Sequence, residues 1–342
     1  MKVFEGYMHG INLGGWLSQC DHTKDRYDNF ILESDIARIS EWGLDHIRIP
    51  VDYNLVEDEE GNYKEDGFSY IDKAIDWCEK YHLNMVLDLH KTYGFSFDSG
   101  EQESGFFENE DYQERFYKLW EVFAKRYGHL SDRLCFEMLN EVTDKEYCEI
   151  WNKISRKCIE RIRKYAPDIQ ILLGGYYNNS IEALKDLDVP FDDKIVYNFH
   201  CYEPLVFTHQ GGYWVDGMDT SFRMPFDVTY AKYDEYTLQN LNRYAERFDT
   251  YDADSVMGVE YFENMMREAI RVAEERDVKL YCGEYGVINL ATPEDTVKWY
   301  RMICSCFDKY GIGRAAWSYK EMDFGLVDDH MKSVFDEMLQ II

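Results

Sequence analysis

Two short apolar runs in this sequence each end in a glutamate. The first covers residues 134–141 and ends in Glu141, and the second covers residues 279–286 and carries Glu284. The runs lie far apart in the chain, so no local structure pairs them. Two carboxylates that face each other across a cleft can cleave a glycosidic bond, because one transfers a proton while the other attacks the anomeric carbon. The sequence therefore predicts a carboxylate pair, provided that the fold brings these two ends together.

The elements that must position the pair are eight short apolar or β-branched runs that read as strands. They cover residues 9–13, 46–51, 84–90, 134–141, 170–175, 195–203, 280–286 and 314–319. Continuous apolar character is typical of parallel strands that are buried on both faces. The stretches between them show helical spacing, as in Phe68, Ile71, Ile75 and Cys78. Eightfold alternation predicts an α/β fold, a single (β/α)8 TIM barrel over residues 1–342.

A doubly wound open sheet is the alternative architecture for such a pattern. It requires a glycine-rich phosphate loop after a strand. The pair Gly14 and Gly15 lacks the G-x-G-x-x-G spacing of that loop. The sequence therefore favours the barrel.

The segment of about residues 204–256 breaks the alternation. It follows the sixth predicted strand, contains few aliphatic residues, and precedes a helical stretch at 260–275. We expect an inserted subdomain on the catalytic face, because the βα loops of a barrel leave from that face. A self-packed subdomain away from the substrate is the alternative. The aromatic residues that would wall a substrate groove are Phe207, His209, Tyr213, Trp214, Phe222 and Phe226.

Polar residues at the carboxyl ends of barrel strands point into the site that those ends surround. These ends carry Arg48, His90, Asn140, Glu141, His200, Tyr202, Glu284 and Trp317. Two carboxylates about 5 Å apart cannot both ionise cheaply, so one keeps a proton at neutral pH. The protonated group can donate to a leaving oxygen, and the ionised group can attack.

Several of these residues have an alternative role. Arg48 stands between apolar neighbours, so its guanidinium requires a carboxylate partner. This partner is Glu284 in a forked contact, Glu137 in a buried ion pair, or both. His90 and His200 lack the H-x-H or H-E-x-x-H spacing of a metal site, so we expect hydrogen bonds to sugar hydroxyls or to the glutamates. A metal-dependent hydrolase is therefore disfavoured, and no metal or organic cofactor is expected.

Tyr202 is placed to hydrogen-bond Glu284, and Trp317 offers a ring for stacking on a sugar. A core position is the alternative for Trp317. Trp214, within the expected insertion, is a further candidate for substrate contact.

Composition limits the partners and the compartment. The net charge of −29 repels phosphate backbones and anionic lipid headgroups, so nucleic acid and membranes are disfavoured, whereas neutral polymers are unaffected. Nine cysteines without a C-x-x-C pair argue for a reducing compartment and against a disulfide framework. Residues 1–7 lack the apolar region of a signal peptide, so we expect a cytoplasmic protein, and we expect a monomer.

The sequence resembles glycoside hydrolase family 5, the retaining (β/α)8 glycosidases. The motifs that carry the resemblance follow one another along the whole chain at residues 11–17, 46–50, 86–90, 140–141, 197–202, 283–286 and 316–320. One departure is Lys91, which stands where a relative in the family carries a second histidine.

The resemblance implies a role for each strand-end residue. Glu141 would be the acid/base, Glu284 the nucleophile, and Asn140 the partner of the sugar 2-hydroxyl. Four others would support the subsite of the reacting sugar: Arg48, His90, His200 and Tyr202. Trp317 would form the platform of that subsite.

These roles predict a retaining endo-β-1,4-glucanase that acts on cellulose-type and mixed-linkage β-glucans. The alternative is the same chemistry on mannan, xyloglucan or β-1,3-glucan. A sugar-binding barrel without turnover would be favoured by a lost carboxylate, but both Glu141 and Glu284 are present.

Overall fold

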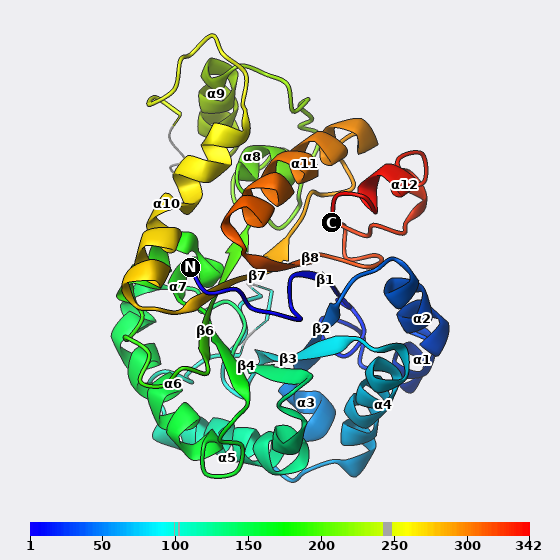
Figure 1. The fold of residues 1–342 in the computed structure, drawn as a ribbon, viewed down its shortest axis with the longest axis vertical. Helices are drawn as coiled ribbons and strands as arrows, with labels where there is room; N and C mark the ends of the chain where they lie inside the picture. Colours follow the sequence, from blue (N-terminus) through cyan, green and yellow to red (C-terminus); the bar gives the residue numbers. More distant parts are fainter. Residues whose placement is uncertain (99, 102, 242–247) are drawn as a thin grey trace.

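The computed structural model describes residues 1–98, 100–101, 103–241 and 248–342. Eight parallel strands close into a barrel in chain order, with helices around it (Figure 1). The strands are β1 (His9–Asn12), β2 (His46–Asp52), β3 (Asn84–Lys91), β4 (Leu134–Glu137), β5 (Gln170–Leu173), β6 (Ile195–Cys201), β7 (Lys279–Tyr285) and β8 (Gly313–Ala316). The predicted (β/α)8 barrel is confirmed.

Helices connect the strands, but not evenly. The long ones follow β2, β3, β4, β6 and β7, whereas β5 is followed by the 3-10 turn Ile181–Asp186. The α-helices are α1 (Lys24–Asn29), α2 (Glu33–Glu41), α3 (Tyr53–Val56), α4 (Glu65–Tyr81), α5 (Glu110–Tyr127), α6 (Cys148–Ile162), α7 (Tyr176–Asn179), α8 (Leu205–Thr208), α9 (Tyr230–Asn240), α10 (Val259–Glu275), α11 (Pro293–Tyr310) and α12 (Phe335–Met338). Among the described residues, no helix is both long and apolar enough to cross a membrane.

Local sequence explains the helix ends. The side chain of Thr292 caps the start of α11 by accepting from the Asp295 amide, and Pro293 occupies the first turn, where no amide hydrogen is needed. Gly311 ends the same helix in a left-handed conformation that glycine adopts without strain. The helix therefore begins and ends where the sequence dictates, which fixes where β8 starts.

The interior of the barrel divides into an apolar end and a polar end. Buried side chains from β3 to β8, and from the segment before β1, fill the amino-terminal end: Phe4, Tyr7, Val86, Cys135, Leu172, Val196, Tyr281 and Ala315. The carboxyl-terminal end carries buried polar groups instead, including Arg48, Glu137 and Glu284. A packed apolar plug therefore supports a polar layer at the face where the βα loops leave the barrel.

Six strands end earlier than the sequence predicts: β1, β4, β5, β6, β7 and β8. β4 ends at Glu137, although the amides of Met138 and Asn140 still donate to neighbouring backbone carbonyls. Glu141 then takes a left-handed backbone conformation with φ 49°, which interrupts the hydrogen-bond pattern of a β-strand. β6 ends at Cys201, one residue before Tyr202. Both polar side chains therefore stand just beyond their strands, at the mouth of the barrel.

The segment at 204–256 divides into two parts, and residues 242–247 of it lie outside the described residues. Its first part, with α8, stays on the mouth of the barrel, where the Ile288 amide after β7 donates to the Thr208 carbonyl at 2.9 Å. Its second part carries α9, which Figure 1 shows at one end of the molecule, outside the ring of helices.

The prediction that Phe207 and Phe226 wall a groove is wrong. Phe207 and Phe226 are fully buried and pack on each other, with ring centroids 5.0 Å apart. Phe222 packs against Tyr236 of α9. These rings form the core of the subdomain itself, because an added helical segment needs its own apolar contacts.

Candidate active site

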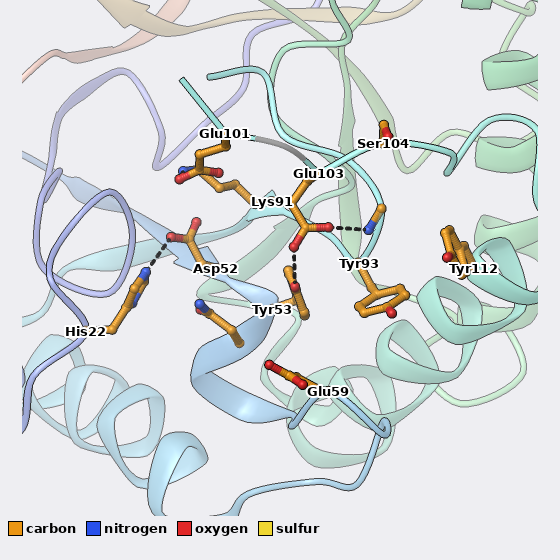
Figure 2. A pocket seen from close by; sticks show the side chains of 12 residues that line it. His22, Asp52, Tyr53, Glu59, Lys91, Tyr93, Glu101, Glu103, Ser104 and Tyr112 are labelled. Carbon is orange, nitrogen blue, oxygen red and sulfur yellow. Dashed lines mark hydrogen bonds and ion pairs between the residues drawn. The ribbon is translucent and has the colours of Figure 1, made fainter. Parts of the chain in front are cut away.

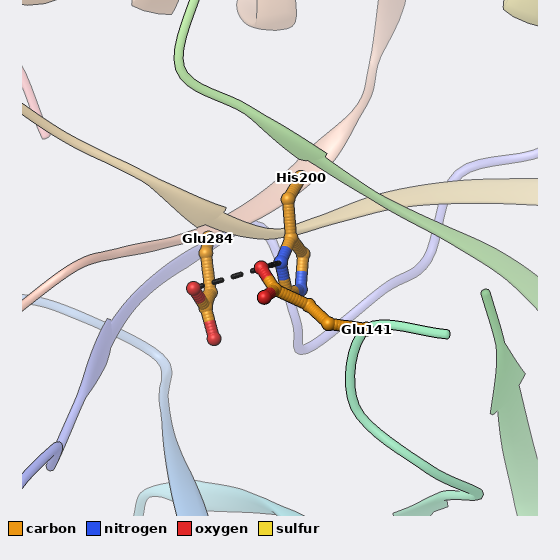
Figure 3. Close-up of side chains that lie close together, drawn as sticks. All are labelled: Glu141, His200 and Glu284. Atoms are coloured by element: carbon orange, nitrogen blue, oxygen red, sulfur yellow. Dashed lines mark hydrogen bonds and ion pairs between the residues drawn. The ribbon is translucent and has the colours of Figure 1, made fainter. Parts of the chain in front are cut away.

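The fold brings the two glutamates together. Figure 3 shows Glu141, beyond β4, and Glu284, in β7, on either side of His200. One oxygen of each carboxylate and a ring nitrogen of His200 lie within 4.8 Å of one another. This spacing is close to the roughly 5 Å at which one carboxylate attacks while the other serves as acid/base.

Arg48 lies at the centre of the polar layer and is completely buried. Its Nε and Nη2 form a bidentate pair with Glu137, at 2.6 and 2.9 Å. Its Nη1 donates to Glu284 Oε1 at 2.7 Å, and its Nη2 lies 3.0 Å from Asp88. Both partners expected from the sequence are therefore engaged at once. The Nη2 group also donates to Asn140 Oδ1 at 2.9 Å, which fixes the residue next to Glu141.

One cation thus serves three buried carboxylates. Burial raises the pKa of Glu137 and raises that of Asp88 to about 7, against the opposing attraction of Arg48. The same carboxylates hold the pKa of Arg48 well above its usual range despite its burial. The guanidinium therefore stays charged, and the excess negative charge favours a retained proton in the cluster.

Hydrogen-bond donors hold both oxygens of Glu284. Arg48 donates to Oε1, and the Tyr202 hydroxyl donates to Oε2 at 2.8 Å. Burial raises the pKa of Tyr202 well above its usual value, so the phenol keeps its proton and remains a donor. Donation from a cation and a hydroxyl stabilises a negative carboxylate. Glu284 is therefore the member of the pair that accepts from a cation as well as from a hydroxyl group.

Within the described residues, both hydrogen-bond donors to the Glu141 carboxylate are neutral. His200 Nδ1 lies 2.7 Å from its Oε1, and Asn178 Nδ2 donates to its Oε2 at 3.0 Å. Burial lowers the pKa of His200 to about 4, so the imidazole is neutral. The amide of Asn179 lies 3.3 Å from His200 Nε2, so that nitrogen accepts and Nδ1 carries the proton. Burial raises the pKa of Glu141 to about 7.

The turn after β5 supplies a partner of Glu141 that sequence reasoning missed. Tyr177, Asn178 and Asn179 are consecutive left-handed residues, with φ of 50, 57 and 56°. The Asn178 amide hydrogen is donated to the Val142 carbonyl at 3.0 Å, which ties the turn to the segment that carries Glu141. The signal in the sequence was the pair of asparagines, because Asn tolerates this conformation better than other residues with a side chain.

A second missed group lies one layer below the glutamates. Asn198 donates to Glu137 Oε1 at 2.7 Å and accepts from the Gly283 amide at 2.9 Å. Asn12 donates to the Gly283 carbonyl at 2.9 Å. These contacts fix the backbone next to Glu284. Alternate polar residues inside otherwise apolar strands were the available signal.

Trp317 and His90 form the floor on the side of β8 and β3. Their rings are parallel, with an interplanar angle of 4° and centroids 5.9 Å apart. Ile288 and Phe324 also pack against Trp317, which leaves 6% of it exposed. His90 Nδ1 lies 2.5 Å from Asp88 Oδ2, so the ring is held by the polar layer. Stacking of a sugar on the exposed part of Trp317 stays a prediction.

Trp214 lies at the rim, where 40% of it is exposed. It contacts His209 and Phe324, with ring centroids 5.9 and 6.3 Å away. Phe324 also contacts Tyr202, at 5.8 Å, so one aromatic path runs from the Glu284 partner to the rim. Trp214 is thus partly exposed, unlike the buried Phe207 and Phe226, and its contact with a substrate stays a prediction.

The donor set around Glu141, His200 and Glu284 is close enough to ligate an ion. However, the oxygens of Glu284 face a guanidinium and a hydroxyl proton, and both oxygens of Glu141 accept hydrogen bonds. A cation would have to displace these donors and lie beside Arg48. The arrangement suits proton transfer and nucleophilic attack better than metal binding.

Comparisons with known proteins identify the family of this chain. The family model described as Cellulase (glycosyl hydrolase family 5) matches residues 9–323. Cellodextrinase A of Ruminococcus flavefaciens is 50% identical over 314 residues, which is 92% of this chain and 86% of the relative. The motifs point within the family to endoglucanase C, and that protein of Acetivibrio thermocellus is 38% identical over 337 residues, 97% of each chain.

A solved structure agrees over nearly the whole chain. The cellulose synthase subunit Z from Clostridioides difficile has a TM-score of 0.75 and 25% identity, covering 96% of this chain and 98% of that one.

We expect the Glu141 carboxyl to titrate near the value set by its burial. In a protein labelled with carboxyl-¹³C glutamate, its resonance should move with a midpoint at pH about 7, assigned by its loss in Glu141→Gln. A midpoint in the ordinary range of an exposed glutamate, about 4, would contradict the assignment.

Asn178→Ala should raise that midpoint, because it removes a donor that favours the ionised form. A hydrogen bond to a charged group contributes about 1.5 kcal/mol, which corresponds to a pKa higher by about one. The matched control is Asn29→Ala, since the Asn29 amide donates to Asp25 on the surface at 2.8 Å. Equal titration midpoints in the two variants would contradict the role of Asn178 as a hydrogen-bond donor to Glu141.

Proposed function

The chain belongs to glycosyl hydrolase family 5 and is a glycoside hydrolase, and from this premise we propose that it is a retaining endo-β-1,4-glucanase of cellulose-type and mixed-linkage β-glucans. The observation that carries the proposal is the close pair of Glu141 and Glu284, whose reacting oxygens lie within 4.8 Å. Inverting enzymes need about 6.5–9.5 Å between the carboxyl groups to admit a water, so the short spacing favours retention.

In the first step, Glu141 protonates the glycosidic oxygen while Glu284 attacks the anomeric carbon. The bond from that carbon to the leaving oxygen breaks, and an ester bond to Glu284 forms. Arg48 and Tyr202 hold the Glu284 oxygens as their negative charge is consumed.

In the second step, a water attacks the same carbon from the side that the leaving sugar has vacated. Glu141, now ionised, takes the proton of that water, and Glu284 leaves as a carboxylate. Esterification removes the neighbouring negative charge of Glu284, which lowers the pKa of Glu141. One residue can therefore serve as acid in the first step and as base in the second.

The relatives support a β-1,4-glucan as substrate. One is named as an endoglucanase and the other, at higher identity, as a cellodextrinase. Hydrolysis of short cello-oligosaccharides is therefore the second candidate function, and it uses the same two carboxylates. Comparing polymers with oligosaccharides separates the two.

Glu284→Gln should lower kcat by about three orders of magnitude or more, because the amide is a poor nucleophile. We would measure new reducing ends from carboxymethyl cellulose, barley β-glucan, xyloglucan, mannan, xylan, laminarin and cellotetraose. Release from the glucans and cellotetraose in wild type, abolished in the variant, is the expected result.

The matched control is Glu160→Gln, at an exposed ion pair with Arg156 on α6. Undiminished release by Glu284→Gln would overturn the nucleophile assignment. New reducing ends from mannan or laminarin alone would leave the proposed mechanism in place, but the substrate would then be that polysaccharide and not a β-1,4-glucan.

The pH dependence of kcat/KM follows from the pKa of Glu141, which burial raises to about 7. The first step needs the protonated form, so kcat/KM should fall as pH rises through that value. The fall should be weaker for a dinitrophenyl glycoside, whose leaving group needs no proton. An equally steep fall for both substrates would mean that another group causes it.

A further inference from the structure

The segment after β8 doubles back on itself at the carboxyl end of the barrel. The Leu326 amide donates to the Ser318 carbonyl at 3.0 Å, and the Val327 amide donates to the Tyr319 carbonyl at 3.1 Å. Hydrogen bonds therefore join the two ends of this segment and leave a tip between them. We name residues 318–328 the β8 loop.

The tip of the β8 loop has an unfavourable backbone conformation. Glu321, Met322 and Asp323 are consecutive left-handed residues, with φ of 55, 56 and 61°. This conformation costs free energy in a residue that carries a side chain, and it persists where surrounding contacts enforce it, as at functional sites. A loop that only reversed the chain would not need three such residues in a row.

Contacts from α1 and from the segment after β1 hold the tip. Arg26 of α1 donates from Nη1 and Nη2 to Glu321 Oε2, at 3.1 and 3.2 Å. The Nε of the same guanidinium donates to the Gly15 carbonyl at 2.6 Å. The Glu321 amide donates to the Asp328 carboxylate, with both oxygens 3.1 Å away. The tip is therefore tied to α1 and to the carboxyl-terminal end of its own loop.

The pair Gly14 and Gly15, which lacks the spacing of a phosphate loop, allows this packing. A Cβ on Gly14 would lie 2.8 Å from the Trp317 ring, and a Cβ on Gly15 would lie 2.6 Å from the Met322 sulfur. Both distances are too short for a real Cβ atom. The two glycines therefore let Trp317 and the β8 loop pack directly on the backbone that follows β1.

Phe324 connects the tip to the active site. It is 5% exposed and forms an apolar cluster with Trp317 and Ile288, against which Tyr202 also packs. The centroids of the Phe324 and Tyr202 rings lie 5.8 Å apart, with an interplanar angle of 62°, which is an edge-to-face arrangement. Phe324 therefore contacts the tyrosine whose hydroxyl donates to Glu284.

Tyr202 depends on ring contacts for its position. It follows the last residue of β6, and its hydroxyl donates to Glu284 Oε2 at 2.8 Å. Two side-chain torsions separate this hydroxyl from the backbone, so its position is set by what packs against the ring. His209 and Phe324 supply such contacts, with centroids 5.0 and 5.8 Å from that of Tyr202, and they lie 5.3 Å from each other. The three rings therefore support one another.

We propose that Phe324 is a positioning residue that holds the Tyr202 hydroxyl on Glu284. The ion pair of Arg26 and Glu321 holds the β8 loop, and with it Phe324, in the required position. The inference rests on the proposed function, because it takes Glu284 as the nucleophile. Phe324 itself takes no part in the chemical step, so its effect on the reaction passes through Tyr202.

The test measures attack by Glu284 directly. In 2,4-dinitrophenyl 2-deoxy-2-fluoro-β-cellobioside, Glu284 forms an ester bond to the anomeric carbon, and the bond to the leaving oxygen breaks. Dinitrophenolate leaves as an anion and needs no proton from Glu141. Fluorine slows hydrolysis of the ester, so the labelled protein is counted by its mass. The limiting rate constant of labelling, kinact, and the half-saturating concentration, KI, separate the chemical step from binding.

Wild type, Phe324→Leu, Tyr202→Phe and the double variant form a double-mutant cycle. We expect kinact to fall about tenfold or more in Tyr202→Phe, as for loss of one hydrogen bond to a charged group. In Phe324→Leu it should fall about threefold or more, as for loss of one aromatic pair, with KI changed less. The double variant should be no slower than Tyr202→Phe, because that variant already lacks the hydroxyl through which Phe324 acts.

Multiplied effects in the double variant would overturn the proposal, because Phe324 would then act independently of the Tyr202 hydroxyl. The matched control is Phe4→Leu, the same change in a buried ring at the amino-terminal end of the barrel. It should be labelled at the wild-type rate, although thermal unfolding should show a lower Tm in both leucine variants. Equal slowing in these two variants would assign the effect to lost stability and would also overturn the proposal.

Glu321→Gln tests the anchor separately, at a side chain that is 59% exposed and so outside the core of the fold. Exposed ion pairs contribute little, so we expect kinact to fall about two- to fivefold at low salt. The fall should be absent when Tyr202→Phe is also present. The matched control is Glu337→Gln, which breaks an exposed pair with Arg301. Equal kinact in the two glutamine variants would refute the anchor, and this comparison decides the proposal if Phe324→Leu does not fold.

Failure of this inference differs from failure of the proposed function. Labelling of the wild type together with multiplied effects in the cycle would overturn the positioning role alone. No labelling of the wild type, and no reducing ends from any substrate, would overturn the proposed function and this inference with it.

Discussion

The site depends on one buried cation. Arg48 contacts Glu137, Asp88 and Glu284 from the interior of the barrel, with no exposure to solvent. Removing one partner of such a cluster leaves an uncompensated buried charge, which costs about 3–5 kcal/mol. Glu137 and Asp88 therefore hold Arg48 in place, and Arg48 in turn holds Glu284. Stability and chemistry share the same contacts here.

Two identical side chains, Glu141 and Glu284, have different electrostatic surroundings. Glu284 accepts from a guanidinium and a phenol, which stabilise its negative charge. Glu141 accepts from a neutral imidazole and an amide, so burial prevails and raises its pKa to about 7. This difference in hydrogen-bond donors is the basis on which we propose Glu141 as the acid/base and Glu284 as the nucleophile.

The net charge of the whole chain is compatible with the neutral polysaccharide that we propose as substrate. A net charge of −29 leaves a neutral polymer unaffected and repels an anionic one. A pocket of about 640 Å³ at the carboxyl ends of β2 and β3 is lined by carboxylates, among them Asp52, Glu59, Glu101 and Glu103 (Figure 2). Lys91, the position at which the sequence departs from a relative, is held by Glu101 and so adds no free positive charge.

The sequence by itself determined the barrel and the residues at its mouth. Parallel strands buried on both faces read as apolar runs, and closure sends all their carboxyl ends to one side. Arg48 and Glu284 therefore meet inside the barrel, and Glu141 follows β4 at the same end. Tertiary structure alone decided what the loops contribute. Asn178 reaches Glu141 from a left-handed turn after another strand, and Phe226 turns into the subdomain core rather than to the substrate. Such contacts depend on how segments without a repeating pattern pack together, and residue spacing carries no record of that packing.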